Sequence, residues 1–246
     1  MGWKASLITV NNCGQTVTDD VVLKALGALK YRADGECALE ECVYPNDRSV
    51  SIGRYNNCLI ICDDLQLVDS ALDVNPAPYE QGLGELFSQS EILSVACLSA
   101  VNFHGYSLFK SPEKIRFKCV DAESPLREWG DLITEELAIY DRAVERDGKT
   151  VWPEALKEDA DVFEEDQLME EFTFGVLKRH LGVRLDSEEG EILFFEVPFK
   201  RYVVEQWKDV PVRSSENTAS AKSGSGWLWL VAAAVLLGAL AFYFLG

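Results

Sequence analysis

The chain has 246 residues and carries 41 acidic against 23 basic side chains, a formal net charge of −18 at pH 7. A field of this sign repels nucleic-acid phosphates and anionic lipid headgroups, which argues against DNA or RNA binding and against flat docking on a membrane. The seven cysteines are an odd number in a chain too large to need disulfide staples. We therefore expect reduced thiols and a cytoplasmic setting.

Short apolar runs alternate with amphipathic patterns through the first half of the chain. Residues 6–10 predict a strand, and acidic residues before VVLKALGAL predict a helix near 20–29. Turn-forming residues then separate further strands. The remaining elements expected in this half are strands at 36–43, 49–55 and 58–62, a helix over 79–88, and strands at 92–98, 101–109 and 114–119.

The second half predicts two helices before a final strand or pair of strands at 190–204. Residues 131–144 are helical in pattern, and 164–182 has acidic residues at its start, basic residues at its end and Gly182 as a C-cap. Pro198 predicts that the last strand lies at an edge or bends. The fold class expected from this order is α+β, a mostly antiparallel sheet covered by helices on one face, in one acidic domain over residues 1–212.

The final stretch, WLWLVAAAVLLGALAFYFLG, contains no charged side chain. Twenty helical residues span roughly 30 Å, the thickness of a bilayer's hydrocarbon core. We expect a transmembrane tail anchor at 227–246, joined to the domain by a flexible linker at 213–226 that is rich in Ser, Gly and Ala. A buried core helix and the removed signal of a lipid anchor are the alternatives. The aromatic residues expected at the two membrane interfaces are Trp227, Trp229, Phe242, Tyr243 and Phe244.

The charges beside this segment predict its orientation. Arg213 and Lys222 precede it and no charge follows it, so the positive-inside rule places the N-terminal domain in the cytoplasm. The expected partners are the lipid bilayer, through this helix, and a basic or membrane-bound protein. Ala234 and Gly238 form a small-xxx-small pair, which predicts a weak homo-oligomer through the anchor. Myristoylation of Gly2 is an alternative membrane device.

Three side chains are the best catalytic candidates. Asp63 and Asp64 follow the apolar run CLIIC, and paired carboxylates there can hold Mg²⁺ or act as a general base. The favoured alternative is that they cap the helix that follows. His104 has Cys97 seven residues upstream, and a Cys and a His can form a nucleophile and base pair. The folded part carries no P-loop, G-x-S-x-G or H-E-x-x-H motif, so catalysis is not the favoured function.

The spacing of cysteines and acidic residues gives equally weak evidence for a metal site. The pairs Cys37 with Cys42 and Cys58 with Cys62 are spaced more widely than the C-x-x-C pairs of structural zinc sites, so they are expected to fill the core. The acid-rich stretch 154–171 lacks the Gly and the third acid of a calcium loop, and it is expected to be a solvated face or a docking site for a basic partner. We therefore predict neither a metal nor a cofactor.

Three short motifs carry a resemblance: Gly2-x-Lys4 before an apolar strand, Cys62-Asp63-Asp64 after one, and Phe174-Gly175-Val176-Leu177 in a late helix. With them the chain resembles a family of uncharacterised bacterial domains over about residues 1–202. The resemblance implies a bacterial origin and no assigned activity, and the tail anchor departs from the soluble members of that family. The favoured hypothesis is an acidic α+β interaction module presented to the cytoplasm at a membrane. The alternative is a membrane-tethered enzyme or small-ligand or metal-binding domain with a site near Asp63 and Asp64.

Overall fold

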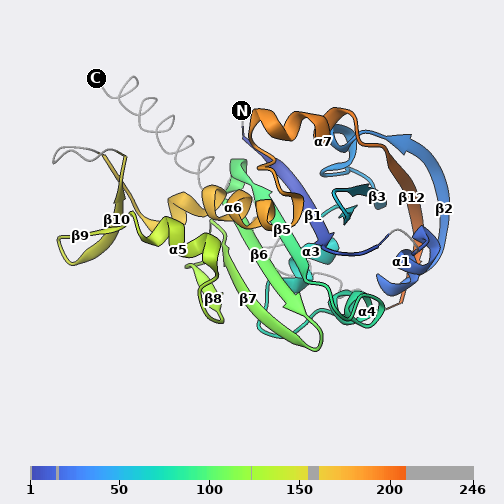
Figure 1. The fold of residues 1–246 in the computed structure, drawn as a ribbon, viewed down its shortest axis with the longest axis horizontal. Coiled ribbons are helices and arrows are strands. Elements are labelled where there is room, and N and C mark those ends of the chain that lie inside the picture. Colours follow the sequence, from blue (N-terminus) through green and yellow to red (C-terminus); the bar gives the residue numbers. More distant parts are fainter. Residues whose placement is uncertain (1, 15–16, 123, 155–160, 209–246) are drawn as a thin grey trace, which may run out of the picture. The chain divides into compact units, whose positions relative to one another are not determined.

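The structure is a computed structural model that describes residues 2–14, 17–122, 124–154 and 161–208. Most of its strands join one nine-stranded sheet (Figure 1). These strands are β1 (Lys4–Val10), β2 (Ala28–Cys37), β3 (Ser49–Tyr55), β4 (Cys58–Cys62), β5 (Ile92–Leu98), β6 (Phe103–Lys110), β7 (Glu113–Val120), β8 (Arg127–Trp129) and β12 (Phe199–Trp207). Their order is β2-β12-β3-β4-β1-β5-β6-β7-β8, and every neighbouring pair is antiparallel. The predicted antiparallel sheet is therefore confirmed.

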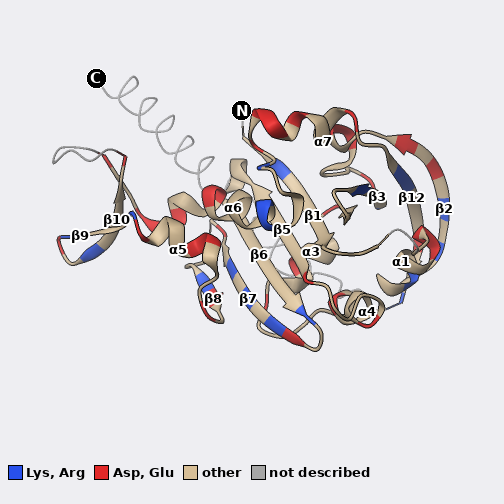
Figure 2. Cartoon of the chain, viewed as in Figure 1, with Lys and Arg blue, Asp and Glu red and all other residues tan. Residues whose placement is uncertain are grey.

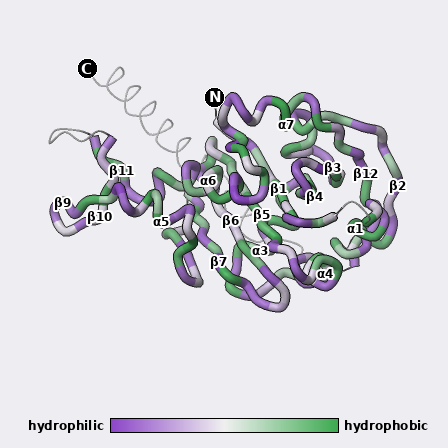
Figure 3. Tube along the Cα trace, in the orientation of Figure 1, coloured by the Kyte–Doolittle hydropathy of each residue, from purple (hydrophilic) through white to green (hydrophobic). Residues whose placement is uncertain are grey.

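A three-stranded antiparallel sheet is the second β element. It contains β9 (Val144–Arg146), β10 (Lys149–Pro153) and β11 (Val162–Phe163). The hairpin of β9 and β10 turns at Asp147 and Gly148, whose φ angles of 53° and 76° suit a two-residue hairpin turn. Its tip is hydrophilic (Figure 3). The sequence patterns did not predict this sheet, because its strands are short.

Helices pack on both faces of the large sheet. The first face carries α1 (Asp19–Ala25), α3 (Gln66–Ala71) and α4 (Pro78–Leu86), whose apolar residues join one buried cluster. The second face carries α2 (Leu39–Cys42), α5 (Thr134–Tyr140), α6 (Met169–Leu181) and α7 (Glu191–Phe195), which share the other cluster. Short 3₁₀ turns are η1 (Ser99–Val101), η2 (Glu165–Leu168) and η3 (Glu188–Gly190).

The two-sided burial explains the sequence of the central strands. Ile8 of β1 belongs to the cluster on the first face, whereas Leu7 belongs to the cluster on the second. Successive side chains of a strand point to opposite faces, so a strand covered on both sides reads as a continuous apolar run. The sequence-based expectation of helices on one face is corrected accordingly.

Agreement with the predicted elements is best in local hairpins. The strands expected at 49–55, 58–62 and 92–98 are β3, β4 and β5 with the same limits, and the helix expected at 164–182 is η2 followed by α6, with Gly182 as its C-cap at φ 80°. The strand expected at 36–43 was wrong after residue 37, because α2 follows β2. The segment expected as strand at 190–204 begins with α7, and β12 lies inside the sheet, with Pro198 just before it.

The membrane-spanning helix of the predicted fold class is not among the elements that the structure describes. No helix within the described ranges combines the length and the apolar character needed to cross a bilayer. The longest of them, α6, has 13 residues, fewer than the roughly 20 that a span requires. The segments predicted as linker and anchor, 213–226 and 227–246, lie outside the described residues. The fold class of the described chain is α+β. The anchor residues named from the sequence, all outside the described ranges, are Trp227, Trp229, Gly238, Phe242, Tyr243 and Phe244.

Candidate metal centre

Asp63 is a buried helix cap. One carboxylate oxygen accepts a hydrogen bond from Ser6 Oγ at 2.5 Å, and the other accepts from the backbone N–H of Leu67 at 2.6 Å, in the first turn of α3. Burial raises the pKa of Asp63 to about 6. Because both oxygens already accept bonds that hold the start of α3, the geometry favours the capping role over a metal or catalytic role.

Asp63 and Asp64 line one small pocket beside the start of α3, and His104 is not part of it. Asp64 is half-buried and accepts a hydrogen bond from Gln66 Nε2 at 3.1 Å. Asp63 bonds to Ser6, whose cross-strand partner Ala96 packs in the cluster on the first face. His104 pairs with Cys97, which packs in the cluster on the second face. The predicted candidates are therefore divided between opposite faces of the sheet.

Cys97 and His104 are direct neighbours across β5 and β6. The sequence placed them seven residues apart without showing contact, and the short connection through η1 folds them into register. Both are buried, with His104 4% exposed. The His104 Nδ1 atom is buried and has no hydrogen-bond partner in the described structure. A buried nitrogen without a partner costs free energy, so this atom is poised for a ligand.

Glu170 completes the group from the first turn of α6. The Cys97 sulfur, a His104 ring nitrogen and a Glu170 carboxylate oxygen all lie within 4.8 Å of one another. Among the residues that the structure describes, this is the group of three such side chains close enough to share an ion, and it includes neither Asp63 nor Asp64. The sequence-based prediction named no metal ligand at these positions.

The electrostatics of the group decide between two chemistries. Burial raises the pKa of Cys97 to about 12, and burial lowers the pKa of His104. At neutral pH both side chains are therefore uncharged, whereas a cysteine nucleophile requires a thiolate, usually stabilised by an adjacent imidazolium. A bound metal ion reverses this preference, because coordination deprotonates a thiol outright. The site is thus better suited to a metal than to nucleophilic catalysis.

Ser99 supports the third ligand. Its hydroxyl donates to Glu170 Oε2 at 2.6 Å and accepts a hydrogen bond from the Trp3 backbone N–H at 3.1 Å. This hydrogen bond fixes one carboxylate oxygen of Glu170. Outer hydrogen bonds of this kind orient metal ligands in proteins.

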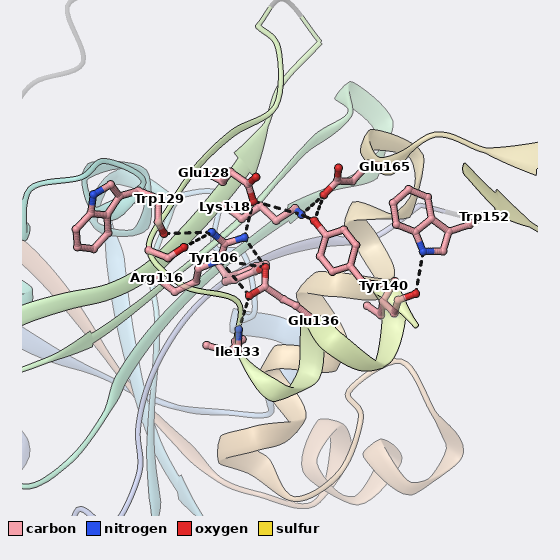
Figure 4. A network of polar contacts seen from close by, with 12 residues as sticks. Tyr106, Arg116, Lys118, Glu128, Trp129, Ile133, Glu136, Tyr140, Trp152 and Glu165 are labelled. Atoms are coloured by element: carbon pink, nitrogen blue, oxygen red, sulfur yellow. Dashed lines mark hydrogen bonds and ion pairs between the residues drawn. The ribbon is translucent and has the colours of Figure 1, made fainter. Parts of the chain in front are cut away.

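A buried polar network lies beside the site on the same face (Figure 4). The Arg116 guanidinium of β7 donates to both carboxylate oxygens of Glu136 on α5, which also accepts from the Tyr106 hydroxyl at 2.6 Å. Lys118 donates to Tyr140 and Glu165, and its Nζ atom lies 4.2 Å from the centroid of the Phe172 ring. These bonds tie α5 and η2 to β7. Because each cation of this network already has an acidic partner, the network itself offers no anion site.

An open groove of about 420 Å³ lies at the same end of β6 and β7. Its lining includes Asn102, two residues before His104, and Val120, the cross-strand partner of His104. Acidic side chains on its wall include Asp121, Glu164, Glu165 and Asp166. None of the three candidate ligands lines this groove, but two of its lining residues, Asn102 and Val120, are neighbours of His104.

Sequence reasoning missed Glu170 because nothing in the spacing of residues links α6 to β5 and β6. Acidic residues crowd the start of that helix, and there they complement the helix dipole wherever the helix packs. The available signal was the pair Cys97 and His104, which predicts a site once the strands are paired. Comparisons with protein-family models, with curated proteins and with solved structures each found no match, so the resemblance to uncharacterised bacterial domains stays a prediction.

Proposed function

We propose that this domain binds a divalent transition-metal ion, with Zn²⁺ as the best match, through Cys97, His104 and Glu170. The observation that carries the proposal is the convergence of these ligands from β5, β6 and α6 within 4.8 Å, at a histidine whose buried Nδ1 atom has no partner in the described structure. It takes the place of the hypothesis of a site near Asp63 and Asp64.

The donor set favours zinc. Zn²⁺ accepts thiolate sulfur, imidazole nitrogen and carboxylate oxygen, whereas Mg²⁺ and Ca²⁺ prefer oxygen ligands alone. Bond lengths of about 2.0 to 2.3 Å around a tetrahedral ion place ligand atoms about 3.5 Å apart. The 4.8 Å limit of the observed group is wider than this, so small side-chain rotations must bring the ligands together on binding.

Three protein ligands leave one tetrahedral position open. Zinc sites that act on substrates keep such a position for water, whereas structural sites fill all four with protein side chains. The neighbouring groove gives solvent and small molecules a route to this end of the sheet. We therefore infer an accessible zinc site that polarises a bound water molecule or small ligand.

The test measures metal binding by the full-length protein after treatment with a chelator. We expect one Zn²⁺ per chain by isothermal titration calorimetry, with release of about one proton, because Cys97 must deprotonate while His104 is already neutral. Co²⁺ in place of Zn²⁺ should give an absorption band from thiolate-to-metal charge transfer. Cys97→Ser should abolish this band, and Cys97→Ser and His104→Gln should each weaken Zn²⁺ binding at least about a hundredfold.

Cys119→Ser is the matched control. Cys119 is also a buried cysteine of the large sheet, but it packs in the cluster on the first face. This variant should bind Zn²⁺ as the original protein does. Equal affinity in the Cys97→Ser and Cys119→Ser variants, both folded by thermal melt, would place any bound ion elsewhere and refute the proposal.

The hypothesis of an acidic interaction module at a membrane stays a prediction from the sequence, together with its bilayer and basic-protein partners. Asp and Glu side chains lie on α1, α5 and α6 and on the turn that leads into α7 (Figure 2). Since they are spread over several elements of the described chain, they do not define one docking surface.

A further inference from the structure

Two buried thiols lie in contact away from the candidate metal centre. The sulfur atoms of Cys42 and Cys62 are 3.8 Å apart, and both side chains are fully buried among the residues of the second face. Cys62 ends β4, which β1 and β5 separate from β6 and its His104. The pair is therefore a separate chemical site, and what it does is independent of the proposed metal binding.

A covalent bond between these two sulfur atoms needs a limited approach. A disulfide has a sulfur–sulfur distance of about 2.05 Å, so the two atoms must approach by about 1.8 Å. Cys42 is the last residue of α2, a helix of four residues, and Cys62 is the last residue of its strand. Both cysteines therefore lie where a regular element ends, and disulfide formation requires side-chain rotation or a shift of α2 to close this distance.

The two thiols differ in acidity. The hydrogen bond with Cys62 lowers the pKa of Cys42, whereas burial raises the pKa of Cys62 well above its ordinary value. In the resting protein the Cys42 thiol donates to the Cys62 sulfur. Once Cys42 loses its proton, the Cys62 thiol can donate back to the Cys42 thiolate, the arrangement that makes one member of a cysteine pair nucleophilic. Cys37, which is 8% exposed, interacts with Cys42 on the same face.

We propose that Cys42 and Cys62 are a redox modification site that forms a reversible disulfide when the protein meets hydrogen peroxide. The Cys42 thiolate attacks one peroxide oxygen, the oxygen–oxygen bond breaks, and one water leaves after protonation. The sulfur of Cys62 then attacks the sulfur of the Cys42 sulfenic acid, and its hydroxyl group leaves as a second water. In total two thiols lose two electrons and two protons, and the peroxide is reduced to two water molecules.

The disulfide would link α2 to β4. These elements already meet the rest of the second face through α7, which contacts α2, and through β1, where the Ser6 N–H donates to the Val43 carbonyl at 2.8 Å. Oxidation therefore fixes α2 against the centre of the sheet. Thiol reductants of the cytoplasm would reverse the bond, consistent with cysteines that are free in the resting protein.

The experiment treats the reduced, chelated full-length protein with hydrogen peroxide under native conditions, blocks the remaining thiols and maps cross-linked tryptic peptides by mass spectrometry. The peptide that carries Cys42 also carries Cys37, and the peptide that carries Cys62 also carries Cys58 and Cys97. Variants must therefore assign the bond. The cross-link should persist in Cys37→Ser, Cys58→Ser and Cys97→Ser, disappear in Cys42→Ser and in Cys62→Ser, and be reversed by dithiothreitol.

Thermal melts establish that each variant is folded, and Cys42→Ala and Cys62→Ala replace any serine variant that is not. A cross-link that survives in a folded Cys42 variant would overturn the proposal. So would peroxide-treated original protein that stays folded and carries sulfinic or sulfonic acid without any cross-link. The outcome does not depend on the proposed metal centre, because a chelator is present throughout. If the protein proved not to bind Zn²⁺, the test of the disulfide would still stand.

Discussion

At the scale of single residues, burial removes polar side chains from water and shifts their pKa values. Most of these buried side chains have a hydrogen-bond or ion-pair partner that replaces the lost water. Asp63 has two hydrogen-bond donors, whereas His104 Nδ1 has none in the described structure. The sequence predicted the capping role of Asp63 because a cap needs only the helix that follows. It could not predict the site of His104, because Glu170 reaches it only through tertiary packing.

Asp63 should make stability depend on pH in a specific window. Its pKa is about 6 in the folded protein against an ordinary value of 3.8, so between these values the folded state holds a proton that the unfolded state has lost. Stability therefore falls as pH rises from about 4 to about 6, by up to about 3 kcal/mol, and then levels off with respect to this group.

Asp63→Asn removes this titration while it keeps an oxygen that can accept the hydrogen bond from Leu67. Urea denaturation of both proteins at several pH values measures the difference in free energy of unfolding. We expect the variant to gain stability relative to the original protein across this window, and a difference that stays constant with pH would show that Asp63 ionises normally. Glu36→Gln, on exposed β2, is the control that should show no such trend.

At the scale of elements, prediction succeeded where the signal is local. The strands β3 and β4 follow from apolar runs on either side of Asn56 and Asn57, which adopt φ angles of 47° and 59° in the turn. The helices α2 and α7 have four and five residues, too few for a helical period to appear in the sequence. Their apolar residues therefore gave the same pattern as a strand.

Lys114 joins three elements on the first face. Its Nζ atom donates to Glu80 of α4, to the Ala71 carbonyl of α3 and to Ser107 of β6, each within 2.8 Å, and the ion pair with Glu80 is almost completely buried. Burial lowers the pKa of Lys114. Lys114, on β7, thus supplies the cation that the buried Glu80 carboxylate and its neighbouring acceptors need.

Lys114→Met should cost about 3 to 5 kcal/mol, because it leaves the Glu80 carboxylate buried without its cation. The double variant Lys114→Met with Glu80→Gln should recover part of the loss, since glutamine still accepts the capping bond from the Ala77 N–H that Glu80 now accepts at 2.7 Å. Lys149→Met is the matched control, because its ion pair with Glu164 is exposed and screened by solvent, so its loss should cost little. Equal losses in the two single variants, measured by chemical denaturation, would contradict the role given to burial.

At the scale of the whole molecule, strands that are far apart in sequence meet in the sheet. β12 lies between β2 and β3 and pairs with both, so the last described strand completes the part of the sheet that the early chain begins. No local pattern specifies such a pairing, which is why the strand order and the two-sided covering by helices could not be predicted. The net charge of the molecule, in contrast, can be predicted from the amino-acid composition alone.

Salt should stabilise the folded protein. The chain has 41 acidic and 23 basic residues, so 18 acidic charges remain without a basic counterpart even if every base is paired. Repulsion among them opposes the compact state. Raising the ionic strength shortens the Debye length from about 8 Å at 0.15 M to about 3 Å at 1 M and screens this repulsion. The exposed ion pairs are screened too, but each contributes only about 0 to 1 kcal/mol.

We therefore expect the melting temperature to rise with sodium chloride in metal-free buffer at neutral pH. Glu188→Gln with Glu189→Gln removes two exposed charges from η3 and should raise the melting temperature at low salt while reducing its dependence on salt. A melting temperature that falls with salt would mean that attraction within the exposed ion pairs outweighs the repulsion. In that case the paired positions of the charges, and not their excess, would govern the electrostatic stability of this fold.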